Sequence, residues 1–121
     1  MRKIVVNGKE YLWQYSFDDY DYQMDSYLTI KTADRKGKLM ISFRGEKNDF
    51  GYCPFNKGLE AICRGEKVII NLNQPRFVAE LIAAALAHLV AAHLEGTTML
   101  KNGVELLRGL GYEFEYGKRW D

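Results

Sequence analysis

The chain has 121 residues, 47% of them hydrophobic, and this suits a single domain over residues 1–121 with its own core. Its 17 basic and 16 acidic residues give a net charge of +1, which speaks against a general attraction to nucleic acid or anionic lipid. Cys53 and Cys63 match no zinc or redox spacing, so we expect reduced thiols and a cytoplasmic protein.

The first half of the chain has the pattern of antiparallel strands joined by tight turns. Asn7-Gly8 between apolar runs predicts a type I′ turn that places Val6 opposite Lys9. The strand that follows alternates, and its predicted aromatic face consists of Tyr11, Trp13, Tyr15 and Phe17. A second hairpin is predicted from strands at Tyr27–Ala33 and Lys38–Arg44.

The second half mixes strand and helix signals. Gly58–Cys63 predicts a short helical turn, and the branched aliphatic run in Lys67–Leu72 predicts a strand. Pro75 suits the first turn of a long helix, which we expect to run to about Glu95 and stop at Gly96. A second helix is expected from Thr97 or Thr98 to Arg108, followed by a strand at Tyr112–Tyr116.

These elements predict an α+β fold. An antiparallel sheet of about five or six strands, mostly hairpin-connected, is expected to pack against one long and one shorter C-terminal helix, and the last strand is expected to return to that sheet. The predicted core is Ile4, Trp13, Leu28, Ile30, Leu39, Ile41, Phe43, Val68, Ile70, Ile82, Leu86, Leu89, Leu107 and Phe114.

The long helix approaches the length of a membrane span, but its composition argues against one. Phe77–Leu94 contains Glu80, His88, His93 and seven alanines, which suit lipid poorly. Its predicted sheet-facing side is formed by Val78, Ile82, Leu86, Leu89, Val90 and His93. Alanines on other sides predict close approach of another helix, either the second helix of this chain or a second copy in a homodimer.

Residues 17–27 form an acidic, tyrosine-rich connection with no basic residue, and its four aspartates lie within residues 18–25. Carboxylates attract cations and aromatic faces complement them, so a basic protein or an organic cation would fit this segment. The other interpretation is a solvated connection between two strands. The aspartate spacing lacks the glycine and distal glutamate of a calcium loop. The candidate partner surface consists of Asp18, Asp19, Tyr20, Asp21, Tyr22 and Asp25.

The chain carries no recognisable catalytic, metal or cofactor motif. His88 and His93 are five residues apart and would project about 140° from each other on a helix, which does not suit two ligands of one metal. Gly109 and Gly111 follow a predicted helix and precede a strand, the reverse of a dinucleotide-binding loop. The basic residues between Lys31 and Lys47 accompany no nucleic-acid recognition motif. We therefore expect no metal and no cofactor.

Together these patterns favour a non-catalytic binding or protein-interaction module that contacts a basic or cationic partner through its acidic segment. The alternative is a small-molecule-binding protein or enzyme with a pocket between the sheet and the long helix. That pocket would be lined by Trp13, Tyr15 and His88.

Overall fold

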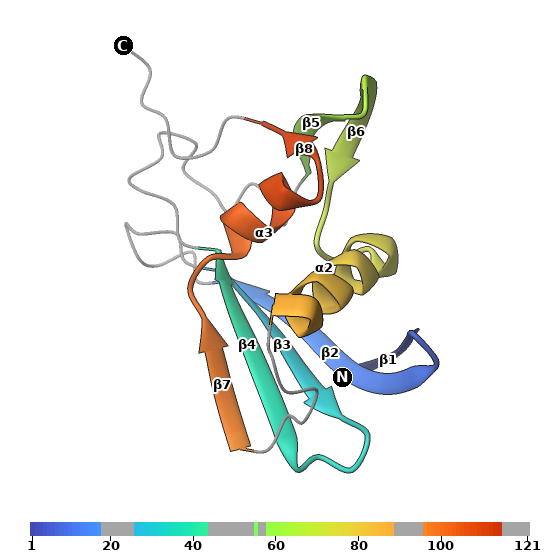
Figure 1. The fold of residues 1–121 in the computed structure, drawn as a ribbon, viewed down its shortest axis with the longest axis vertical. Helices are drawn as coiled ribbons and strands as arrows, with labels where there is room; N and C mark the ends of the chain where they lie inside the picture. Colours follow the sequence, from blue (N-terminus) through green and yellow to red (C-terminus); the bar gives the residue numbers. More distant parts are fainter. Residues whose placement is uncertain (18–25, 44–54, 56–57, 89–95, 115–121) are drawn as a thin grey trace.

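The protein is an α+β fold with two separate sheets, as seen in a computed structural model that describes residues 1–17, 26–43, 55, 58–88 and 96–114 (Figure 1). One sheet has five strands in the order β1-β2-β3-β4-β7, and the other has three in the order β6-β5-β8. The described elements are β1 (Arg2–Val6), β2 (Lys9–Phe17), β3 (Ser26–Thr32), β4 (Gly37–Phe43), β5 (Leu59–Cys63), β6 (Glu66–Ile70), α2 (Pro75–His88), β7 (Gly96–Leu100), α3 (Gly103–Gly109) and β8 (Tyr112–Glu113).

The first hairpin has the predicted turn and register. Asn7 and Gly8 adopt φ values of 52° and 77°, as a type I′ turn requires, and Val6 pairs with Lys9. With this register the aromatic face of β2 faces the core, and Tyr11, Trp13 and Tyr15 are buried there. The side chain of Phe17 lies outside the described residues.

The second hairpin also forms where it was predicted, between β3 and β4. Its turn is held by Asp34, whose carboxylate accepts hydrogen bonds from the Thr32 hydroxyl (2.6 Å) and the Lys36 backbone N–H (3.0 Å). These two bonds, with the positive charge of Lys36, lower the pKa of Asp34. The buried faces of β3 and β4 continue that of β2, because Trp13 pairs with Ile30 and Ile30 with Leu39.

The prediction of a single antiparallel sheet is wrong in two ways. Gly96–Leu100 forms β7 and pairs in parallel with β4, whereas Gly96 was expected to stop one helix and Thr97 or Thr98 to begin the next. The N–H of Gly96 also bonds to the carbonyl of Lys36 (3.1 Å), so this segment satisfies its backbone along the edge of β4. Consequently α3 begins only at Gly103, and its end at Gly109 agrees closely with the prediction.

The second error concerns Gly58–Cys63, expected to be a helical turn. Leu59–Cys63 is strand β5, which pairs with β6 through a tight turn at Arg64 and Gly65. Both turn residues have positive φ, 54° and 83°. The final strand pairs with β5 and not with the larger sheet, and the end of its predicted range lies outside the described residues.

Helix α2 begins at Pro75 as predicted, and its predicted continuation to Glu95 lies outside the described residues. Val78 and Ile82 are buried, but Phe77 and Leu81 are buried as well, so the buried surface of α2 is wider than one stripe. Phe77 packs against Tyr112 of β8, with ring centroids 5.9 Å apart. α2 also contacts α3, one of the two helix partners that its small residues predicted.

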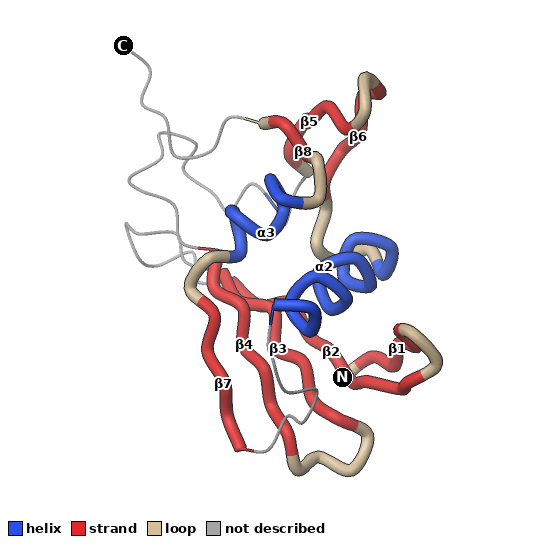
Figure 2. The backbone as a smooth tube through the Cα atoms, viewed as in Figure 1, coloured by secondary structure: helices blue, strands red, loops and turns tan. Residues whose placement is uncertain are grey.

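One cluster of buried side chains joins both sheets and both described helices. Figure 2 shows the two groups of strands apart, with the helices between them in this view. In the described parts of the chain, no helix combines the length and apolar character needed to cross a membrane. Of the predicted core, Ile4, Val68, Leu86 and Phe114 are only partly buried, Leu89 lies outside the described residues, and the other members are buried.

Candidate functional site

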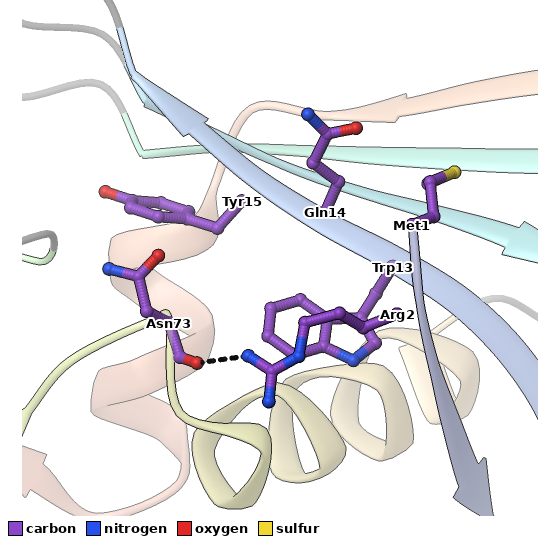
Figure 3. Close-up of a pocket in the computed structure, with 6 residues that line it drawn as sticks. All are labelled: Met1, Arg2, Trp13, Gln14, Tyr15 and Asn73. Carbon is purple, nitrogen blue, oxygen red and sulfur yellow. Dashed lines mark hydrogen bonds between the residues drawn. The ribbon is translucent and has the colours of Figure 1, made fainter.

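An open hollow lies beside the part of β2 that has no β1 partner. β1 pairs with β2 only over Lys9–Trp13, whereas β2 continues to Phe17. The hollow has a volume of about 360 Å³ and is called here the Arg2–Trp13 hollow. Figure 3 shows its lining, which consists of Met1, Arg2, Trp13, Gln14, Tyr15 and Asn73.

Arg2 is the only charged side chain among these lining residues, and two contacts orient it. Its guanidinium carbon lies 4.6 Å from the centroid of the Trp13 ring, a cation–π arrangement. One guanidinium N–H donates to the backbone carbonyl of Asn73 at 2.8 Å, drawn as the dashed line in Figure 3. The position of the guanidinium is thus set by a buried ring and a backbone oxygen.

Trp13 forms the floor under Arg2. It extends from β2 toward α2 and is only 2% exposed (Figure 3). Its indole Nε1–H has no hydrogen-bond acceptor among the described residues. A buried donor without a partner costs free energy. The Trp13 ring is therefore well packed, but its indole N–H is an unsatisfied hydrogen-bond donor.

The segment before α2 presents the Asn73 carbonyl to Arg2. The side-chain oxygen of Asn71 accepts the backbone N–H of Asn73 at 2.9 Å, and the Asn71 carbonyl accepts that of Gln74 at 2.9 Å. Such an Asx turn suits the entry to a helix, and Pro75 then opens α2 without needing a donor of its own. The first turn of α2 contains no acidic residue.

The hollow therefore combines one fixed cation, two side-chain amides and two aromatic rings. None of its lining residues is a carboxylate. In the described residues, no group of three or more His, Cys, Asp or Glu side chains is placed to hold a metal ion. The chemistry available at the hollow is hydrogen bonding and charge pairing.

The predicted site residues fall in three places. Trp13 and Tyr15 line the hollow. His88 is the last residue of α2, about 20 Å along the helix from Pro75 at 1.5 Å per residue. All six residues of the predicted partner surface (Asp18, Asp19, Tyr20, Asp21, Tyr22 and Asp25) lie outside the described residues.

Sequence reasoning missed four of the lining residues, Met1, Arg2, Gln14 and Asn73. The predicted register contained a signal for Arg2, because a two-residue turn at Asn7-Gly8 also places Arg2 opposite Trp13, as observed. Asn73 reaches the site through the packing of α2 on the larger sheet. The helical pattern predicted that packing, but not which residue before the helix would come to lie beside Trp13.

A second polar contact lies at the other side of α2. The buried Tyr112 hydroxyl donates a hydrogen bond to the carboxylate of Glu80. Burial, and then the bond and negative charge of Glu80, raise the pKa of Tyr112. This contact ties β8 to α2 and lies apart from the hollow.

Comparison with protein-family models, with curated proteins and with solved structures gives no match for this chain.

Proposed function

We propose that the protein is a non-catalytic binding module and that residues 18–25 contact a basic protein or an organic cation. The observation that carries the proposal is the concentration of four aspartates, and no basic residue, in this short segment. Its placement supports it. Phe17 and Ser26, which flank the segment, are paired across β2 and β3, so both ends of the segment start from one end of the larger sheet. Four carboxylates within eight consecutive residues attract a multivalent cation more strongly than the same charges dispersed along a chain do.

The test is a titration with hexalysine, followed by backbone amide NMR signals. Hexalysine is expected to shift signals of residues 18–25, and the effect should weaken as salt is added. Replacing Asp18, Asp19, Asp21 and Asp25 by Asn should abolish these shifts. A matched variant changes the exposed Glu60, Glu66, Glu105 and Glu113 to Gln, which removes the same charge elsewhere. If both variants lost hexalysine binding equally, the binding would depend only on the net charge of the protein, and the proposal would be overturned.

The second candidate function is binding of a small ligand, and the Arg2–Trp13 hollow favours it. Two of the three residues predicted to line a pocket, Trp13 and Tyr15, line this hollow beside the start of α2. Aromatic walls with a few fixed polar groups are the usual composition of ligand sites. A ligand at this site is expected to shift the indole N–H signal of Trp13 and to leave residues 18–25 unaffected.

A further inference from the structure

We propose that the Arg2–Trp13 hollow is a binding site for an organic carboxylate, with Arg2 as the group that holds the carboxylate. The inference deepens the second candidate function, ligand binding in the hollow, and is independent of the acidic segment.

The first support is the state of Arg2. A guanidinium has five N–H donors, and in the described structure Arg2 uses one of them, toward Asn73. Within the described residues no carboxylate pairs with it, and the ion pairs there are Lys3 with Glu10 and Arg108 with Glu105. Arg2 is exposed, so its remaining donors are accessible to a ligand.

The second support is preorganisation. An arginine side chain normally loses much rotamer freedom when it binds an anion. Here the ring of Trp13 and the carbonyl of Asn73 already fix the guanidinium plane in the free protein. A fixed planar fork matches the two oxygens of a carboxylate, and little additional ordering is needed on binding.

The third support is the electrostatic character of the lining. Met1, Gln14, Tyr15 and Asn73 add no negative charge to the hollow. The first turn of α2, which follows Asn73 and Gln74, contains no acidic side chain to offset the partial positive charge of a helix N-terminus. Both features favour an anion over a cation.

The aromatic and thioether groups of the lining indicate what kind of group should carry the carboxylate. Tyr15 and Met1 contribute apolar groups to the lining, whereas the Trp13 ring is covered by Arg2. Figure 3 shows the Tyr15 ring on the same side of β2 as the Arg2 guanidinium. A carboxylate attached to an apolar or aromatic body would use both kinds of surface. Volume agrees, because about 360 Å³ lies within the usual size of small-ligand sites.

The test uses phenylacetate as the probe and phenylacetamide as its neutral isostere. The indole N–H signal of Trp13 reports binding, and Trp120→Phe assigns it because the chain has two tryptophans. Phenylacetate is expected to shift this signal saturably, and phenylacetamide is expected to leave it unchanged. In Arg2→Gln the dissociation constant for phenylacetate should rise about tenfold, the value of one charge-assisted hydrogen-bonded contact.

Lys3→Gln is the matched control, since it removes the same charge one residue further along β1. Lys3 does not line the hollow, so this variant should bind phenylacetate as the parent protein does. Equal weakening in both variants, or equal binding of acid and amide, would overturn the carboxylate inference while leaving the hollow as a ligand site. No shift with either probe would overturn the inference and the second candidate function together. The amide spectrum of each variant verifies that it is folded.

Discussion

Among the titratable groups in the described part of the chain, Tyr112 has the ionisation most strongly affected by folding. Its ring is buried against Phe77, and its hydroxyl donates to Glu80 across the gap between β8 and α2. Ionising this hydroxyl in the folded protein would bury a phenolate beside a carboxylate, which is why its pKa is raised. The unfolded chain has no such constraint, and there a tyrosine ionises near pH 10.

A pH-dependent loss of stability follows from this difference. The stabilisation from the Tyr112 proton is complete below about pH 10 and is lost as the pH rises further, because only the unfolded state then releases the proton. Between pH 8 and 11, the free energy of unfolding should therefore fall more steeply in the parent protein than in Tyr112→Phe, measured by urea denaturation. At pH 8, Tyr112→Phe should cost about 0.5–1.5 kcal/mol for the lost hydrogen bond.

Glu80→Gln supplies the control for this prediction. It keeps the buried phenol and removes the negative charge beside it, so its stability should depend on pH less steeply than that of the parent. Parallel pH profiles in all three proteins would show that Tyr112 does not contribute this dependence.

At the scale of single elements, local turn chemistry decided which predictions succeeded. Asn7-Gly8 favours positive φ at both turn positions, so the first hairpin and its register were predictable. Arg64-Gly65 adopts the same kind of turn, but arginine is not a residue that favours a φ of 54°. β5 therefore had no recognisable turn signal and was mistaken for a helical turn.

The candidate site was predictable to a similar extent. Alternation in β2 placed Trp13 and Tyr15 on one inward face, and both line the hollow. Their neighbour Asn73 comes from a segment about sixty residues later in the chain than Trp13. Tertiary packing, which single-sequence patterns do not encode, brings these residues together.

Helix α3 packs so closely on β4 that one of its glycines has no room for a side chain. A Cβ at Gly103 would lie 2.6 Å from two ring carbons of Phe43 and 2.8 Å from the carbonyl oxygen of Ser42. Phe43 is fully buried and its ring packs on Phe55, 5.5 Å away between centroids, so it has little freedom to move. The contact between α3 and β4 depends on the missing side chain.

Gly103→Ala is expected to lower the free energy of unfolding by about 1–3 kcal/mol, the usual cost of overpacking, despite the better helix propensity of alanine. Gly109→Ala is the matched control in the same helix, since a Cβ there meets no atom within 4 Å. It should be neutral or slightly stabilising. Urea denaturation of both variants measures the difference, and equal stability of the two would contradict the close packing described here.

At the scale of the whole molecule, the two sheets share one buried cluster. α2 contacts β1 of the larger sheet, and α3 contacts both β4 and β8, so the helices connect the sheets. The backbone N–H of Leu72 also bonds to the carbonyl of Phe55 at 2.9 Å near the junction. We expect the protein to unfold as one cooperative unit, in keeping with a single domain.

Ile69 and Ile70 are neighbours in β6 that test this cooperativity. Ile70 is fully buried, whereas Ile69 is 61% exposed. Ile70→Ala should cost about 2–5 kcal/mol, and Ile69→Ala should cost well under half of that. Hydrogen exchange should show the Ile70→Ala loss equally in amides of β3 and β5. A loss confined to the smaller sheet would mean that the two sheets unfold separately.

The parallel pairing of β4 with β7 has a consequence for the order of events during synthesis. β4 ends at Phe43, yet its outer neighbour begins at Gly96, after β5, β6 and α2. While the ribosome is still making the intervening residues, one side of β4 has exposed backbone donors and acceptors, and such an edge readily pairs with other chains. The nascent protein is therefore most vulnerable to aggregation in this interval, and a chaperone that shields extended segments would give the greatest benefit then.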